Sequence, residues 1–206
     1  MSNNIFLVGI DEAGRGPIAG PVAVGVCMIE KKFKREIIQI FKGLTDSKEH
    51  NQKEREFWYK VLTREKANGL VKFEVGFSSA RIIDKKGIMF AINRALSKAL
   101  NKLLIKDKDL CEVVLDGSLK APAEFKFQET IIRGDKTEKI ISMASIVAKV
   151  ERDGLMRKLS RKYPEYAFDI HKGYGTVRHF ELIDKYGVSE AHRMSFLLKR
   201  GLVKKI

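Results

Sequence analysis

The chain has 206 residues, and 40 Lys and Arg against 26 Asp and Glu give it a formal net charge of +14 and a pI near 9.7. A protein this basic attracts polyanions, so nucleic acid is the expected partner. No cationic segment precedes the first apolar run, which Asp11, Glu12 and Arg15 interrupt. Neither a signal peptide nor a membrane span fits, and we expect a cytoplasmic protein.

Short stretches rich in Val, Ile and Phe predict five strands. They cover residues 5–10, 22–29, 71–77, 112–115 and 127–132. Cys27 lies inside the second of these apolar runs and Cys111 directly before the fourth, where a free thiol behaves as a small buried hydrophobe. We therefore expect neither a disulfide nor a zinc site.

Helical patterns lie between the strands. Residues 48–66 follow Asp46, with Glu49 three residues beyond it, which predicts a capped helix. Residues 88–103 repeat apolar side chains at helical spacing, so helices can cover both faces of the sheet. A long helix is expected over residues 137–163, and its first half must be buried because it carries almost no charge.

The chain after Pro164 is polar and irregular before helical patterns resume. Residues 177–186 predict a helix, and residues 189–206 predict a short helical cap. Neither an internal repeat nor a low-complexity linker separates this part from the rest. We therefore expect one domain over residues 1–206, with 164–206 packing on it as an extension.

Four acidic residues stand where predicted strands end or helices begin. Asp11 and Glu12 close the first strand, Asp116 follows the fourth, and Asp135 precedes the long helix. If the first and fourth strands are parallel neighbours, their carboxyl ends meet at one edge of the sheet, where α/β proteins bind ligands. Consecutive residues on a strand point to opposite faces, so Asp11 and Glu12 share a site only if the strand breaks there.

Clustered carboxylates require a counter-charge, because two of them about 4.5 Å apart repel by roughly 4 kcal/mol at an effective dielectric near 20. Oxygen ligands favour Mg²⁺ or Mn²⁺, and two such ions about 4 Å apart promote phosphodiester hydrolysis. The alternative is that the acids are helix caps or turn residues. Gly14, Arg15 and Gly16 follow the first pair, and glycines there allow a backbone approach to a sugar or phosphate.

Several other kinds of site are missing from the sequence. The glycines at 14 and 16 are followed by Pro17 rather than by a helix, so they are no dinucleotide-binding fingerprint. No P-loop, no H-E-x-x-H pair and no G-x-S-x-G elbow occurs, which removes the zinc-protease and serine-hydrolase interpretations.

Between about Phe6 and Phe196 the chain resembles ribonuclease HII, the type 2 ribonuclease H family. The resemblance rests on seven blocks in the family's order, and together they are highly specific. The blocks are residues 9–17 (GIDEAGRGP), 46–48 (DSK), 115–117 (LDG), 134–135 (GD), 144–153 (ASIVAKVERD), 171–176 (HKGYGT) and 192–196 (HR and SF).

The resemblance implies an α/β fold, a ribonuclease-H-like mixed five-stranded sheet flanked by helices, with the helical extension at its C-terminal end. It implies that Asp11, Glu12, Asp116 and Asp135 bind the catalytic Mn²⁺ or Mg²⁺. The expected substrates are RNA–DNA hybrids and duplex DNA with embedded ribonucleotides, cut on the 5′ side of a ribonucleotide to leave a 5′-phosphate and a 3′-hydroxyl.

The resemblance also implies the substrate contacts and the oligomeric state. Gly14, Arg15 and Gly16 would read 2′-hydroxyls at the RNA-to-DNA junction, Tyr174 would pack on the deoxyribose beyond it, and Arg15 and Lys48 would hold phosphates. The chain is expected to be a monomer. It departs from the family after Lys48, where Glu49-His50-Asn51 replaces the usual Lys and Leu.

Three rival interpretations remain. Ribonuclease HIII is the nearest, but its members carry an extra domain ahead of the catalytic one, whereas the first strand here begins by Ile5. A junction resolvase of the same fold would share only the acidic cluster. A non-catalytic nucleic-acid-binding protein would use its charge for affinity alone, through counterion release.

Overall fold

The computed structural model describes residues 5–117 and 119–199 and contains a five-stranded sheet in the order β3-β2-β1-β4-β5. β1 pairs antiparallel with β2 and parallel with β4, so the sheet is mixed and the predicted parallel pair is confirmed. The outer strand β3 is antiparallel to β2, and β5 is parallel to β4. The strands are β1 (Phe6–Ala13), β2 (Val22–Glu30), β3 (Lys72–Ser78), β4 (Cys111–Asp116) and β5 (Phe127–Ile131).

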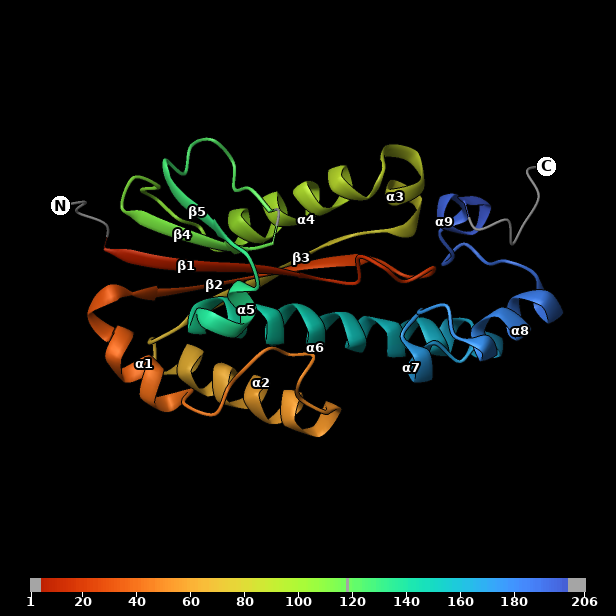
Figure 1. Cartoon of the computed structure of the whole chain (residues 1–206), viewed down its shortest axis with the longest axis horizontal. Helices are drawn as coiled ribbons and strands as arrows, with labels where there is room; N and C mark the ends of the chain where they lie inside the picture. Colours follow the sequence, from red (N-terminus) through yellow and green to blue (C-terminus); the bar gives the residue numbers. More distant parts are fainter. Residues whose placement is uncertain (1–4, 118, 200–206) are drawn as a thin grey trace.

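Helices cover both faces of this sheet (Figure 1). The helices on one face are α3 (Ala80–Lys86) and α4 (Ile88–Lys102), and those on the other are α1 (Lys34–Ile40), α2 (Gln52–Ala67), α5 (Gly134–Thr137) and α6 (Lys139–Lys162). Each face has its own apolar core: Val24, Val113 and Leu96 are buried on the α4 side, and Cys27, Val147 and Leu62 on the α6 side.

Two glycines bring α6 unusually close to the sheet. A Cβ added to Gly9 on β1 would lie 2.4 Å from the carbonyl oxygen of Ile140, and one added to Gly25 on β2 would lie 2.3 Å from that of Ala144. Glycine in a strand interior weakens the strand but permits such a close backbone approach. The uncharged first half of α6 therefore packs directly against the backbone of the central strands, as its composition predicts.

The C-terminal helices lie beyond the ends of the strands, where η2 and α7 pack against α6, α8 packs against η2, and α9 packs against α3 (Figure 1). They are the short η2 (Pro164–Tyr166), α7 (Phe168–His171), α8 (Val177–Tyr186) and α9 (Met194–Lys199), and a short η1 (Lys31–Phe33) precedes α1. Phe168, Met156 and Leu197 are fully buried in a third apolar cluster. The last part of the expected cap, 200–206, lies outside the described residues, as do 1–4 and 118. No helix in the described part of the chain is long and apolar enough to cross a membrane.

The predicted start of the helix at residue 48 is wrong. α2 begins at Gln52, because the side chain of Asn51 accepts a hydrogen bond from the amide of Glu54 while Glu54 bonds back to the amide of Asn51. This reciprocal capping box fixes the first turn. Asp46 instead accepts a hydrogen bond from the amide of Lys48 at 2.9 Å, which forms a turn before the helix.

The expected long helix over 137–163 is interrupted near its start. Glu138 has φ −107° and ψ 111°, an extended conformation, so the four-residue helix α5 is separated from α6. Asp135 therefore lies within α5 rather than just ahead of the long helix. The C-terminal end before Pro164 agrees with the prediction, as do the bounds of α8.

Candidate active site

The four predicted acidic residues lie around the carboxyl ends of β1 and β4. Pairing between these two strands ends at Ile10 and Leu115, whereas β1 continues beside β2 as far as Ala13. The expected break of regular structure at Asp11 and Glu12 is wrong, because β1 stays paired with β2 and opens only along the edge toward β4. The two side chains therefore start from opposite faces of the strand, and what they share is the charge of Asp116, which acts on both carboxyls. Asp11 is the first residue of β1 past that pairing, and Asp116 is the last residue of β4.

Asp116 holds the segment that carries Asp135. Its Oδ1 accepts hydrogen bonds from the amide of Gly134 at 2.7 Å and from the amide of Asp135 at 3.5 Å. Arg133 before them is left-handed with φ 57°, which turns the chain back toward β4. The turn brings two carboxyls that are far apart in the sequence to one place.

Burial and mutual repulsion make the first pair of acids unusually hard to ionise. Asp11 is 4% exposed, and burial raises the pKa of its carboxyl well above the usual value, with further increases from the charges of Glu12 and Asp116. Burial also raises the pKa of Glu12, against the opposing charge of Arg15 3.5 Å away. The charges of Asp11, Glu12 and Asp116 thus act on one another at short range.

Lys48 lies inside this acidic cluster. Its ammonium is 3.2 Å from Asp135 Oδ2 and 3.9 Å from the carboxylate of Asp46, a buried acid that the sequence interpretation expected only as a helix cap. Burial lowers the pKa of Lys48, but the hydrogen bond to Asp135 and the nearby carboxylates outweigh it and raise the pKa. The side chain is 77% exposed, so it can move away when another cation or a substrate phosphate approaches.

The donor atoms suit a hard divalent cation. Each of the four acids offers carboxylate oxygen, the ligand that Mg²⁺ and Mn²⁺ prefer, and burial disfavours the charged forms of Asp11 and Glu12 unless a cation lies beside them. Within residues 5–117 and 119–199, no group of three or more His, Cys, Asp and Glu side chains is already arranged to hold a metal ion. Binding of a metal ion would therefore require side-chain rotation and displacement of Lys48 from Asp135.

The Gly14-Arg15-Gly16 segment is fixed by two buried arginines. Arg193, which is 0% exposed, donates to the carbonyls of Gly14 at 2.7 Å, Arg15 at 3.0 Å and Gly20 at 2.9 Å. Arg152, also fully buried, lies so close to Gly14 that a Cβ there would be 1.9 Å from its Nε. Gly14 has φ 88°, so both its conformation and its surroundings require glycine.

Arg152 also connects this segment to the loop that carries Tyr174. It donates to the carbonyls of Pro21 at 2.9 Å, Ala19 at 3.3 Å and Lys172 at 3.0 Å. Tyr174 is 44% exposed, which leaves one face of its ring available to a ligand. The candidate specificity segments, residues 14–16 and Tyr174, are therefore tied to one another through buried guanidinium groups.

Three of the four histidines form a buried stack behind Tyr174. The rings of His171 and His179 are 4.1 Å apart, and Nε2 of His179 is 3.1 Å from Nε2 of His192. His179 Nδ1 is 2.8 Å from the carbonyl of Tyr174. Burial lowers the pKa of both His179 and His192 to about 4. The expected structural roles of His171 and His192 fit this arrangement.

We predict that this stack makes the fold sensitive to acid. An unfolded histidine takes up a proton below about pH 6.5, whereas the folded imidazoles of His179 and His192 stay neutral down to about pH 4. The unfolded state therefore binds more protons between pH 6.5 and 4, and stability falls as the pH falls. With allowance for partial screening, the loss is on the order of 2 kcal/mol per imidazole.

Urea denaturation at pH 7 and pH 4.5 measures this loss. The His192→Gln variant should show a smaller change in free energy of unfolding between the two pH values. His50→Gln, which alters the histidine outside the stack, should keep the full change. An equal pH dependence in all three proteins would remove the stack as its cause.

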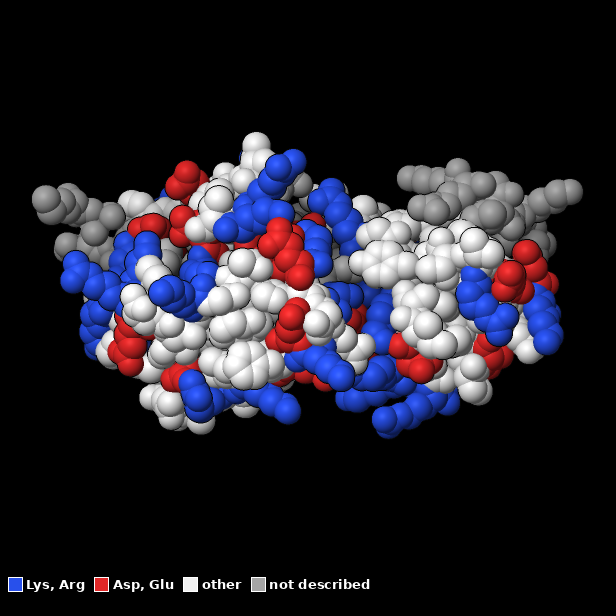
Figure 2. Space-filling view, turned by 60° about the horizontal axis from the view of Figure 1, so that its bottom comes forward, with Lys and Arg blue, Asp and Glu red and all other residues white. Residues whose placement is uncertain are grey.

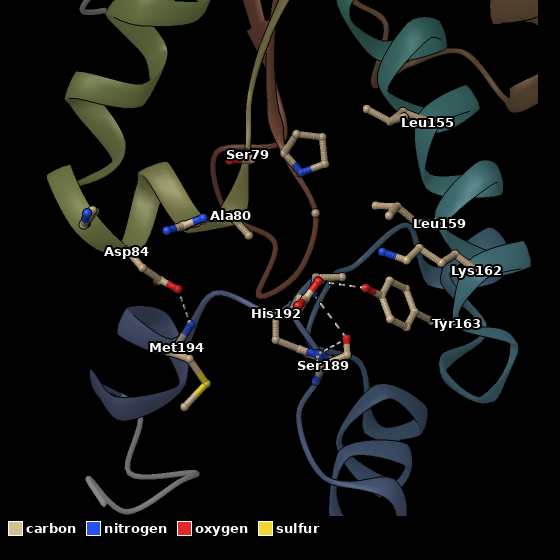
Figure 3. Close-up of a pocket in the computed structure, with 16 residues that line it drawn as sticks. Ser79, Ala80, Asp84, Leu155, Leu159, Lys162, Tyr163, Ser189, His192 and Met194 are labelled. Carbon is tan, nitrogen blue, oxygen red and sulfur yellow. Dashed lines mark hydrogen bonds between the residues drawn. The ribbon is translucent and has the colours of Figure 1, made fainter.

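One pocket lies away from the acidic centre, and none of the four carboxyls lines it. It has a volume of about 770 Å³ and is formed by α3, the second half of α6 and the segment before α9 (Figure 3). Asp84 on α3 accepts a hydrogen bond from the amide of Met194 at 3.0 Å across one wall, with Leu155 and Leu159 on the opposite side. The pocket contains none of the predicted metal ligands, whereas the acidic residues lie around the strand ends.

The family model for ribonuclease HII matches residues 8–199. The chain belongs to the ribonuclease HII family. It is 39% identical over 199 residues to a ribonuclease HII of Bacillus cytotoxicus, covering 97% of this chain and 71% of that protein. Ribonuclease HII is a metal-dependent endonuclease that hydrolyses the RNA strand of RNA–DNA hybrids, so this chain is a ribonuclease H.

Solved structures agree with the fold. The ribonuclease H2 of Pyrococcus horikoshii OT3 superposes with a TM-score of 0.74 at 27% identity over 96% of both chains. A Bst-RNase HIII solved in complex with Mn²⁺ gives a TM-score of 0.69 at 16% identity, over 98% of this chain and 70% of that one. This second likeness shows the ribonuclease-H-like fold alone, and the ribonuclease HII assignment rests on the family model.

The sequence interpretation missed the supporting residues of the site. Asp46, Arg152 and Arg193 all lie in the blocks that carry the resemblance, yet Asp46 was expected only as a helix cap and the two arginines had no assigned role. One signal was present, because Arg152 follows a helical half with almost no charge, where a charged residue must find buried partners. Their actual partners are mostly backbone carbonyls, which no residue pattern identifies.

Proposed function

We propose that this ribonuclease HII cuts the RNA strand of hybrids and also incises duplex DNA on the 5′ side of a single embedded ribonucleotide. The proposal rests on the position of Asp11, Glu12, Asp116 and Asp135 around the ends of β1 and β4, next to a segment in which Arg15 and Gly16 are exposed. The 2′-hydroxyl is the group that distinguishes RNA from DNA, and such a backbone can approach it closely.

The four carboxyls are proposed as the metal ligands, with Mg²⁺ or Mn²⁺ as the ion. Two bound ions would stabilise the attacking and leaving oxygens of an in-line displacement that yields a 5′-phosphate and a 3′-hydroxyl. Asp116 fixes the position of Asp135 through the amides of residues 134 and 135, so these two ligands keep their spacing. Burial of Asp11 keeps bulk water from screening the centre.

The substrate contacts are proposed on the same face. Gly14, Arg15 and Gly16 would contact the ribonucleotide, since Arg193 and Arg152 hold their backbone in place. Tyr174 would pack on the deoxyribose that follows, and Arg15 and Lys48, which are both well exposed, would contact phosphates. A monomeric chain, a single domain over 1–206 with 164–206 as its extension, and a cytoplasmic location stay predictions.

Duplex DNA containing one ribonucleotide is the deciding substrate. With Mg²⁺ or Mn²⁺ we expect incision 5′ to the ribonucleotide, and addition of EDTA should abolish it. Duplex DNA of the same sequence without the ribonucleotide serves as the control and should stay intact. If only substrates with several consecutive ribonucleotides are cut, the proposed single-ribonucleotide specificity is wrong.

A further inference from the structure

Basic side chains gather around one buried carboxylate on α6, away from the four acids. Lys149 Nζ is 2.8 Å from Asp153 Oδ1, and Arg55 on α2 is 4.0 Å from Asp153 Oδ2. The charge of Asp153 also acts on Lys172, together with the charges of Arg55 and Arg157. Four cationic residues from three segments therefore surround Asp153.

Asp153 cannot neutralise these cations alone. It is 4% exposed. Glu56 lies 3.6 Å from Arg157, and the charge of Asp169 acts on Lys172, so three carboxylates face four cations. Burial lowers the pKa of Lys149 and of Lys172, and the neighbouring arginines lower both further. A partly buried cluster with surplus positive charge stabilises a bound anion.

The cluster lies next to the proposed specificity residue Tyr174. Lys149 Nζ is 5.9 Å from the centre of the Tyr174 ring, and Lys172 precedes that residue by two positions. Figure 2 shows basic side chains gathered in the hollow between the sheet-bearing part of the molecule and the C-terminal helices. An anion held here would touch the same strand of nucleic acid as the tyrosine.

The cluster is also joined rigidly to the acidic centre. Arg55 donates to the carbonyl of Ser47 at 3.2 Å, and Ser47 Oγ is 2.7 Å from Oγ of Ser145, whose hydroxyl bonds to Asp11. Ser145 and Lys149 are four residues apart on α6, a rise of about 6 Å. That rise equals the axial length of about two nucleotides in one strand.

We propose that Lys149, Lys172 and Arg55 form a binding site for a backbone phosphate of the DNA that follows the RNA-to-DNA junction. The inference rests on the proposed function and adds the phosphate that fixes the register between Tyr174 and the cut. Arg55 and Asp153 hold the cluster together, and the two ammonium groups contact the phosphate. A single phosphodiester at a set distance from the scissile bond is therefore recognised by its charge.

Binding to modified duplexes tests the site without any cleavage. Two inactive proteins are compared, the Asp116→Asn variant and the Asp116→Asn, Lys149→Gln double variant. Each is titrated with a series of duplexes that carry one ribonucleotide and one neutral methylphosphonate, whose position moves by one nucleotide from duplex to duplex. Neutralising one phosphate, about two nucleotides beyond the junction, should weaken binding roughly tenfold when Lys149 is present. The same methylphosphonate should have little effect on binding by the protein with Lys149→Gln, because the modified phosphate and the altered side chain remove the same contact.

Salt dependence supplies an independent measurement. Lys149→Gln should reduce the slope of log affinity against log salt by about one. Lys98→Gln removes the same charge from an exposed position on α4, on the other face of the sheet, and should show no coupling to any single phosphate. Lys172→Gln repeats the experiment if Lys149→Gln is poorly folded by circular dichroism.

The outcomes separate this site from the proposed function. Methylphosphonate penalties that are equal with and without Lys149, or that spread evenly over all positions, overturn the phosphate site while incision by the wild-type enzyme stands. Inorganic phosphate should compete with the duplex for the protein that keeps Lys149 and not for the protein with Lys149→Gln. That result supports binding of an anion by the cluster. Lack of incision by the wild-type enzyme 5′ to a single ribonucleotide contradicts the proposed function whatever the binding results show.

Discussion

Asp116→Asn should lower the cleavage rate on the order of a thousandfold, because it removes one charge of the proposed metal site and with it several kcal/mol of transition-state stabilisation. Asparagine has the same shape and keeps an Oδ1 that can accept the 2.7 Å hydrogen bond from Gly134. The segment with Asp135 should therefore stay in place. Single-turnover cleavage of a labelled hybrid measures the rate, and fluorescence anisotropy measures retained binding.

The matched control lies just ahead of the start of the same strand. Asp109→Asn changes an exposed carboxylate that pairs with Lys126 at 2.9 Å, two residues ahead of β4. This variant should cut at the wild-type rate. If Asp116→Asn also cuts as fast as the wild type, the assignment of the acidic centre is wrong.

Arg193→Met should lower the free energy of unfolding by about 3 kcal/mol, since three buried carbonyls lose a charged donor. Burial already lowers the pKa of this guanidinium to about 9, a sign of how poorly it is solvated. Methionine fills most of the space but donates nothing. The 14–16 segment should lose its fixed backbone, so KM for a single-ribonucleotide duplex should rise.

Urea denaturation gives the stability, and amide exchange at residues 14–16 reports the local change. Arg94→Met serves as the control because Arg94 is exposed on α4, where the loss of a side-chain charge should be nearly neutral. Equal urea midpoints for Arg193→Met and the wild type would show that the carbonyl contacts contribute little to the fold.

The sequence predicts most of the framework because periodicity encodes it. The five strands, the parallel pairing of the first and fourth, and the helices at 88–102 and 177–186 all follow from apolar patterns. The helix start at Gln52 does not, because two capping boxes compete within seven residues and only tertiary contacts select Asn51 over Asp46. The short helices α1, α3 and α7 have too few residues for a periodic signal.

The candidate site shows the same division. Asp11 and Asp116 could be placed together from strand order alone, since parallel neighbours end at the same edge. The position of Asp135 depends on a left-handed Arg133 and an extended Glu138, conformations that the residue types do not favour. The contact of Lys48 with Asp135 spans 87 residues, and local sequence carries no record of such a pair.

The contact of α6 with β1 and β2 has a consequence for how the enzyme tolerates change. At Gly9 and Gly25 the separation of helix and sheet is set by main-chain atoms, with no side chain between them. Apolar residues elsewhere in the core can vary in size without shifting α6 at these two points. The position of Ser145, Lys149 and Arg152 relative to the strand ends is therefore insensitive to substitutions in the surrounding core. A single methyl group at either glycine would displace all three residues.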